Sequence, residues 1–113
     1  MTITYEVRNG TCLLALKGDF DRANLPELAE TMKDCLGSAS SIALDFQAVT
    51  FVDGGVLSLL HQALEDLEGQ GWLGVVRPTP WGRWLIAIAG LSAQTNFRIF
   101  STMQEALEVI DQG

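Results

Sequence analysis

The sequence predicts an α/β fold in which a mixed β-sheet of four to five strands is packed with about four α-helices. Apolar residues first alternate with polar ones and later recur every three or four positions, so strands and helices follow one another along the chain. The first two strands follow each other directly, whereas helices separate the later strands, which should therefore run parallel. The 113 residues, 48% of them hydrophobic, suffice for one core, and we expect one domain over residues 1–113.

The first two strands are predicted to form a hairpin at the start of the sequence. Residues 2–8 alternate between apolar and polar side chains, and an apolar run resumes over residues 12–17. The dipeptide Asn9-Gly10 between these runs is typical of a tight hairpin turn. We therefore expect the first two strands to be antiparallel.

Two amphipathic helices follow, with strands between them. Apolar residues recur at helical spacing over residues 24–36, and Gly37 is expected to end this helix. Residues 41–46 alternate as a strand, and a short apolar run over residues 50–52 leads into the second helix. The second helix is predicted at about residues 54–68.

The next strand and helix are marked by turn and capping residues. Gly69 and Gly71 should end the second helix, and residues 72–76 are predicted to form a strand. A third helix is expected to begin at Thr79-Pro80, because threonine can cap a helix and proline loses nothing at its first position. Gly90 should stop this helix.

The C-terminal segment is predicted to be a strand followed by a helix. Residues 91–96 are loop-sized, and residues 97–100 form a short apolar run. Thr102, with Glu105 three residues later, satisfies the capping-box pattern at the start of the last helix.

Composition excludes several classes of partner. Seven Lys and Arg against fourteen Asp and Glu give a net charge of -7, which on average repels a phosphate backbone or an anionic membrane. We therefore expect no nucleic-acid partner. The N-terminus lacks the pattern of a targeting peptide, and no apolar run is long enough to span a bilayer, so we expect a cytoplasmic protein without membrane insertion.

The cysteines and the single histidine indicate no metal site. Cys12 and Cys35 form no CxxC motif, and His61 has too few companions for a transition metal. We interpret both thiols as free and buried, with a structural disulfide as the alternative. No cofactor is expected.

Three segments, taken in order, carry a family resemblance. The sequence Gly18-Asp19-Phe20-Asp21 leaves a strand before a helix, residues 44–53 (LDFQAVTFVD) lead from a strand to the next helix, and Ala89-Gly90-Leu91 precedes the last strand. Their order and spacing resemble the sulfate transporter and anti-sigma factor antagonist (STAS) domain, specifically its bacterial single-domain antagonists. The similarity covers roughly residues 4–107.

The resemblance implies a function in transcription regulation and signalling. It implies a mixed sheet of four or five strands with helices, which binds a kinase-like anti-sigma factor and so releases the sigma factor. In that family the second hydroxyl residue after the aspartate is phosphorylated by the partner. The matching run here is Gly54-Gly55-Val56-Leu57, so Gly55, at that position, cannot accept phosphate.

A phosphate at this position would act through the helix start. The amide groups and partial positive charge of a helix N-terminus hold an anion, and phosphorylation changes the shape and charge of the docking surface. We expect Asp53 to cap the second helix, with a family-like contact role as the alternative. For Gly54 and Gly55 a sharp turn is favoured over an anion cradle, because the Lys of a phosphate loop is missing.

The resemblance and the sequence together predict a partner-binding surface. The charged loop formed by Asp19, Asp21 and Arg22 is interpreted either as solvated or as a partner contact. Ser58 is interpreted either as an exposed serine or as a substitute phosphate acceptor. The residues assigned to this surface are Asp19, Asp21, Arg22, Asp53, Gly54, Gly55, Val56 and Ser58.

The third helix suggests a second interface. Trp81 and Trp84 lie at helical spacing in a segment that is apolar on most sides and has Arg83 as its one charge. Such a helix is either deeply buried or covered by something else, and we expect at least one indole to be exposed, or covered by a homodimer or a partner.

The sequence favours a binding module over an enzyme. Ser58 and His61 lie near each other on one helical surface, but no further imidazole or oxyanion-hole pattern accompanies them. The leading hypothesis is an anti-sigma factor antagonist-like module that binds constitutively. The alternative is a STAS accessory subunit of a phospholipid-transport ATP-driven complex, or a scaffold in a stress-signalling assembly.

Overall fold

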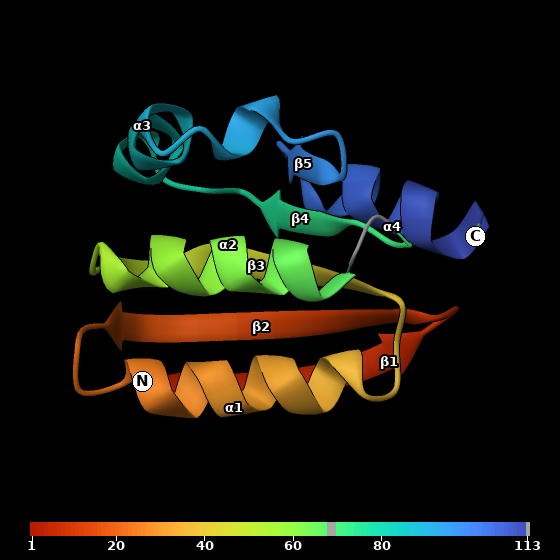
Figure 1. The fold of residues 1–113 in the computed structure, drawn as a ribbon, viewed down its shortest axis with the longest axis horizontal. Coiled ribbons are helices and arrows are strands. Elements are labelled where there is room, and N and C mark those ends of the chain that lie inside the picture. The colour runs from red at the N-terminus through yellow and green to blue at the C-terminus, as the bar shows by residue number, and fades with distance from the viewer. Residues whose placement is uncertain (68–69, 113) are drawn as a thin grey trace.

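Five strands form one mixed sheet in the order β1-β2-β3-β4-β5 (Figure 1). The computed structural model describes residues 1–67 and 70–112. The strands are β1 (Thr2–Arg8), β2 (Thr11–Phe20), β3 (Ser41–Val52), β4 (Leu73–Val76) and β5 (Phe97–Phe100). Strands β1 and β2 are antiparallel, and all later pairs are parallel, which confirms the predicted mixed sheet.

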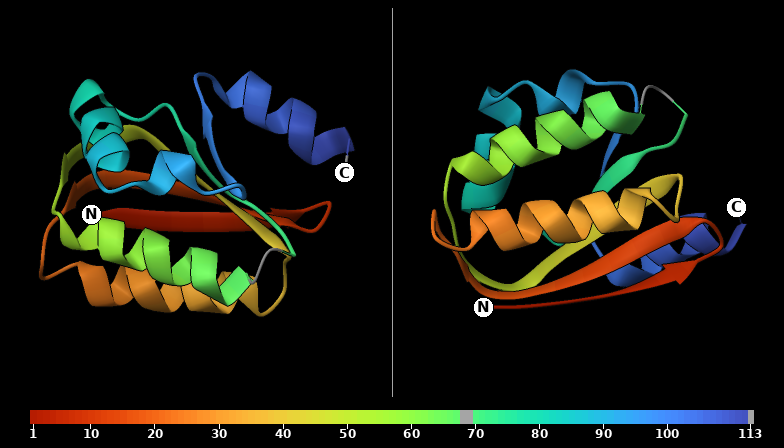
Figure 2. Two further views of the ribbon diagram at one scale, coloured as in Figure 1. Left: turned by 45° about the horizontal axis from the view of Figure 1, so that its top comes forward. Right: turned by 60° about the horizontal axis from the view of Figure 1, so that its bottom comes forward.

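The helices cover both faces of this sheet. They are α1 (Leu25–Leu36), α2 (Gly55–Leu67), α3 (Pro80–Ile88) and α4 (Met103–Gln112), with a 3₁₀ turn η1 (Leu91–Ala93) after α3. Figure 2 shows α1 and α2 side by side on one face and α4 on the opposite face. The predicted end of the second helix at Glu68 and the terminating Gly69 lie outside the described residues.

The hairpin turn has the predicted conformation. Asn9 and Gly10 have φ angles of 51° and 77°, both in the left-handed region that two-residue hairpins of type I′ require. The turn sets the register, with Val7 opposite Cys12 and Ile3 opposite Leu16. The hairpin prediction is therefore confirmed.

A hydrophobic cluster lies on each side of the sheet. The larger one joins the strands to α1, α2 and α3, and its fully buried members include Phe20, Leu28 and Leu60. The smaller one lies under α4 and is formed by Ala43, Val76, Phe100 and Ala106. Packing on both faces places the central strands in the interior, as expected for parallel strands.

Strand β3 is longer than the sequence indicated. Residues 41–46 and 50–52 were expected as separate runs, but they belong to one strand, Ser41–Val52. The strand stays paired to β2 along this length because the register slips twice, between Ala15 and Lys17 and between Gly18 and Asp19. These slips interrupt the alternation on which the shorter prediction rested.

The capping residues behave largely as predicted. The Thr79 hydroxyl accepts a hydrogen bond from the Gly82 amide at 3.0 Å. Thr102 accepts from the Glu105 amide at 3.1 Å, and the Glu105 carboxylate reaches the Ser101 amide at 3.0 Å, one residue earlier than in a standard capping box. The predicted loop after α3 contains the short turn η1.

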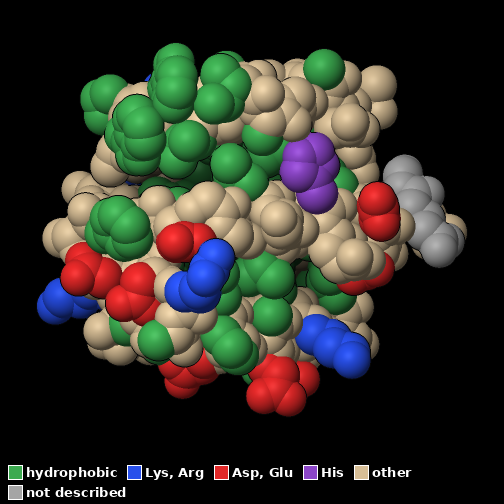
Figure 3. Space-filling model, turned by 60° about the vertical axis from the view of Figure 1, so that its left-hand side comes forward, with side chains coloured by type: hydrophobic (Ala, Val, Ile, Leu, Met, Phe, Trp, Pro, Cys, Tyr) green, Lys and Arg blue, Asp and Glu red, His purple; other side chains and the backbone are tan. Residues whose placement is uncertain are grey.

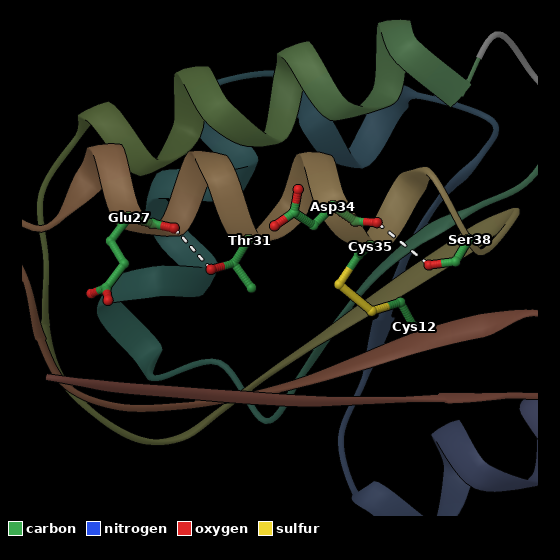
Figure 4. Close-up of a disulfide and its surroundings, with 6 residues drawn as sticks. All are labelled: Cys12, Glu27, Thr31, Asp34, Cys35 and Ser38. Carbon is green, nitrogen blue, oxygen red and sulfur yellow. Dashed lines mark hydrogen bonds between the residues drawn. A yellow bond between two sulfur atoms is a disulfide. The ribbon is translucent and has the colours of Figure 1, made fainter.

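The two cysteines form a disulfide, so the expectation of free thiols is wrong. Cys12 on β2 and Cys35 on α1 are bonded, with their Cα atoms 5.8 Å apart (Figure 4). Both are fully buried, as expected. The alternative of a structural disulfide is the correct one, because the packing of α1 on β2 brings together two residues that are 23 positions apart in sequence.

Candidate functional site

Two loops meet at one end of the sheet, where β2 and β3 end. The Thr50 hydroxyl donates a hydrogen bond to the Asp19 carboxylate, and the Asp53 amide donates to the Phe20 carbonyl at 2.9 Å. These contacts join the ends of β2 and β3 and hold the start of the β3–α2 loop against the last residue of β2. The carboxyl ends of parallel strands are the usual place for binding sites in open α/β sheets.

The β2–α1 loop is held by its own aspartate and asparagine. The Asp21 carboxylate accepts from the Ala23 and Asn24 amides at 3.0 and 3.2 Å. The Asn24 side chain donates to the Asp19 carbonyl at 2.7 Å. Asp21 therefore shapes the loop while staying exposed, and Arg22 at its tip is also exposed.

Asp53 caps the start of α2. Its Oδ1 atom accepts a hydrogen bond from the Gly55 amide at 2.8 Å, and its carbonyl accepts from the Val56 amide at 3.0 Å. The carboxylate thus satisfies one of the free amides of the first turn and lies at the positive end of the helix. These contacts give Asp53 a structural role.

The two glycines at this helix start differ in their surroundings. A Cβ atom on Gly54 would meet no atom within 4 Å. A Cβ atom on Gly55 would collide with Cδ1 of Leu25 and lie 3.1 Å from Oδ1 of Asp53. The close approach of α1 to α2 therefore favours glycine at position 55, and the position of the expected phosphate acceptor is partly covered by Leu25.

The predicted surface residues do not all share one environment. Asp19, Asp21 and Arg22 are exposed beside the start of α2, and Ser58 is exposed one turn into that helix. Val56 is only 1% exposed and packs in the larger hydrophobic cluster, so it offers a partner no surface.

An apolar surface adjoins the charged loop. Trp81 and Trp84 on α3 are 58% and 52% exposed, and their rings stack with centroids 4.9 Å apart. Ile88 on the same helix and Phe51 at the end of β3 are also more than half exposed. In Figure 3 the apolar side chains of this end of the molecule gather above the acidic and basic ones.

An apolar groove runs between α2 and α3. Its walls come from the end of β3, from the first turns of α2 and from one side of α3. The lining residues are Phe46, Val49, Val52, Val56, Leu57, Leu60, Val75, Pro78, Thr79, Gly82, Leu85 and Ile86. Phe51 and Trp81 line a second hollow next to it. This end of the molecule therefore combines charged loops with an apolar groove.

Sequence reasoning missed Phe51, Ile88 and Leu25. Phe51 lies beyond the register slip that places Gly18 opposite Val49 and Asp19 opposite Phe51, so regular alternation could not show which side it faces. Ile88 follows Trp84 at helical spacing, but that spacing was interpreted mostly as core packing and not as an exposed stripe. The contact of Leu25 with Gly55 has no local sequence signal.

Other functional chemistry has limited support in the described chain. Nε2 of His61 lies 3.1 Å from the Ala89 carbonyl, so this imidazole links α2 to the end of α3. Within residues 1–67 and 70–112, no three His, Cys, Asp or Glu side chains are grouped to hold a metal ion. In the same part of the chain, every helix is too short or too polar to cross a bilayer.

Solved structures with the same fold are anti-sigma factor antagonists. An antagonist from Mycobacterium paratuberculosis is 24% identical over 97% of this chain and 93% of that chain, with a TM-score of 0.81. An antagonist (STAS) domain protein from Planctomyces limnophilus is 16% identical over 96% of both chains, with a TM-score of 0.82. SpoIIAA in its unphosphorylated form is 18% identical over 97% and 98%, with a TM-score of 0.77.

A family model extends this similarity from fold to sequence. No curated protein matches the chain. The model described as "Mlab, STAS domain", however, matches residues 3–100, which include the whole sheet and both loops of the site. The chain therefore belongs to the STAS domain family.

Proposed function

We propose that this chain is a protein-binding module of the anti-sigma factor antagonist type, whose docking site lacks the phosphate switch at the start of α2. One observation carries the proposal. Gly55 occupies the first position of α2, has no hydroxyl group, and is packed against Leu25. A related fold, SpoIIAA of Bacillus, has been solved in a phosphorylated form, so the comparison with a switchable antagonist is direct.

The proposed docking surface combines charge with the free end of a helix. It consists of Asp19 near the end of β2, Asp21 and Arg22 in the β2–α1 loop, Asp53, Gly54 and Gly55 at the helix start, and Ser58 one turn later. The proposed partner is a kinase-like anti-sigma factor or another ATPase-domain protein. Binding is constitutive because the partner cannot add a repelling phosphate at position 55.

We propose that the module regulates transcription in the cytoplasm by binding and not by catalysis. Ser58 and His61 are one turn apart on α2, but Nε2 of His61 lies 3.1 Å from the Ala89 carbonyl, which ties this imidazole to the end of α3. A cytoplasmic disulfide is uncommon, and complete burial of Cys12 and Cys35 would protect it from reductants.

A second candidate function rests on the family model. That model carries the description "Mlab, STAS domain" and not that of an antagonist. It favours an accessory subunit of a phospholipid-transport ATP-driven complex, which would use a transporter ATPase as partner. A scaffold in a stress-signalling assembly would use the same fold with another surface.

Purification of the tagged chain from its own cells tests these alternatives. A copurified kinase-like ATPase domain supports the antagonist module, and a copurified transporter ATPase supports the accessory subunit. Recovery should fall for Arg22→Glu, which inverts charge at the docking surface, and should be unchanged for Lys33→Glu, which alters an exposed residue in the last turn of α1. Equal loss with both variants would remove the assignment to this surface.

A further inference from the structure

Helix α3 carries two apolar stripes. Its inner stripe packs on the sheet through Ile86, which is 4% exposed, and through the half-buried Leu85. Its outer stripe is formed by Trp81, Trp84 and Ile88, all more than half exposed. Packing of the inner stripe is enough to hold a surface helix on the domain. The fold therefore does not explain why the exposed outer stripe is apolar.

The outer residues form one continuous line along the helix. Positions 81, 84 and 88 are separated by three and four residues and therefore lie on one helical face. The rings of Trp81 and Trp84 stack on each other, which joins the two exposed indoles into one aromatic cluster. Trp84 stands near the middle, about 4.5 Å along the axis from Trp81 and about 6 Å from Ile88.

We infer that this stripe is the contact surface of a homodimer, in which α3 of one copy packs antiparallel against α3 of a second copy. With the two-fold axis at Trp84, Trp81 of one copy lies over Ile88 of the second copy, because the two are nearly equally far from the axis. The two-fold symmetry produces this contact between Trp81 and Ile88 twice. Each bulky residue thus meets an apolar partner without a change in backbone.

The exposed area fits a weak dimer. Side chains of this size expose on the order of 100 Å² each when about half accessible, so the stripe and the neighbouring Phe51 offer roughly 400–500 Å² per copy. Pairing two copies buries about 1,000 Å² in total with the surrounding rim, which is near the lower limit for a specific interface. We therefore expect a dissociation constant between ~1 µM and ~1 mM.

The outer stripe offers no charge that would select an oppositely charged partner. The outer stripe carries no charged side chain, and the one charged residue of α3, Arg83, points to Ser101, whose hydroxyl lies 3.4 Å from its guanidinium. Nothing on the stripe would select a basic or acidic partner. The net charge of -7 on each copy opposes pairing at long range.

Analytical ultracentrifugation of the purified chain tests this inference without any partner, so its result is separate from that of the proposed function. Between ~1 µM and ~1 mM protein the average mass should rise from monomer toward dimer. Raising NaCl from ~50 to ~500 mM should strengthen the dimer, because salt screens the repulsion but not the apolar contact. Trp84→Ala should weaken the dimer at least ~10-fold, whereas Tyr5→Ala, a half-exposed aromatic on the distant strand β1, should not.

Several outcomes would overturn the inference. A monomer at every concentration and salt condition excludes the second copy, as does a dimer that Trp84→Ala leaves intact or that salt weakens. If the monomer instead binds the copurified ATPase or vesicles in a Trp84-dependent manner, that occupant takes the place of the second copy. Circular dichroism of each variant shows whether its fold is retained, and Trp84→Gln serves as a second variant if Trp84→Ala does not fold.

Discussion

The side chain of Leu25, the first residue of α1, packs directly against the backbone of Gly55, the first residue of α2. No Cβ atom fits at position 55 unless Leu25 moves. Glycine at this helix start avoids a contact that a shift of the Leu25 side-chain tip would otherwise have to relieve, and it leaves the position without a hydroxyl. The same contact fixes α1 against the turn that carries the proposed docking surface.

This contact predicts opposite effects of alanine at the two glycines. Gly55→Ala should lower the free energy of unfolding by less than about 1 kcal/mol, because its Cβ has to displace only the terminal methyl group of the half-buried Leu25 side chain. Gly54→Ala should raise it by about 0.5 kcal/mol, because its Cβ enters open space and the unfolded chain loses entropy. Urea denaturation of both variants measures the difference.

The double variant Leu25→Ala/Gly55→Ala isolates the contact. Once Leu25 is shortened, Gly55→Ala should cost almost nothing, so the coupling free energy should equal the small cost of the single variant, below about 1 kcal/mol. Additive effects in the cycle would contradict this interpretation.

Substitutions of Asp53 and Arg22 should distinguish an effect on stability from an effect on partner affinity. Asp53→Ala removes the carboxylate that accepts from the Gly55 amide, so unfolding free energy should fall by about 1 kcal/mol together with partner affinity. Arg22→Ala changes an exposed loop tip and should reduce affinity while stability stays within about 0.5 kcal/mol. Calorimetric titration and thermal melts give the two quantities. Full affinity in Arg22→Ala would exclude that side chain from the interface.

The buried disulfide should contribute strongly to stability. Replacing Cys12 and Cys35 together by alanine opens a link across 23 residues and should lower the unfolding free energy of the oxidised protein by about 3 kcal/mol. Reduced wild type should resemble the double variant. Mass spectrometry after alkylation in denaturant, without reductant, should find no modified cysteine. Two alkylated thiols would show that the bond is not formed in solution.

Two ion pairs that differ in burial should differ in their contribution to the free energy of unfolding. Nη2 of Arg77 lies 2.9 Å from Oδ2 of Asp45, whose side chain is 15% exposed, and the Asp45 carboxylate also accepts from the Gln47 amide. Arg77→Met should therefore cost about 2 kcal/mol. Arg8→Met breaks a pair with Asp111 that is more than 40% exposed on both sides and should cost less than about 1 kcal/mol. Equal losses in chemical denaturation would refute the dependence on burial.

Local signals predicted much of the fold. Asn9-Gly10 specified a turn whose two residues both have positive φ, and Thr79 specified the start of α3, because turn and cap preferences are properties of a few adjacent residues. The alternation of strands and helices gave the sheet and its mostly parallel pairing. These features depend on short-range chemistry and therefore appear in the sequence.

Features that depend on tertiary packing could not be predicted in the same way. The bond between Cys12 and Cys35 and the contact between Leu25 and Gly55 both arise from where α1 lies on its neighbours. The exposure of Phe51 follows from a register slip that no alternation pattern shows. The sequence suggested exposure of the α3 tryptophans, but only the folded chain separates the outer stripe from the inner one.

We propose that the chain binds an ATPase-domain partner without a phosphate switch. The most direct measurement is incubation of wild type with its copurified partner and ATP, followed by intact-mass spectrometry and calorimetric titration of the recovered protein. We expect no added phosphate, and we expect the dissociation constant for the partner to be the same before and after incubation. Stoichiometric phosphate on Ser58 or another hydroxyl, with a weakened dissociation constant, would contradict it, because the switch would then have moved to a different residue.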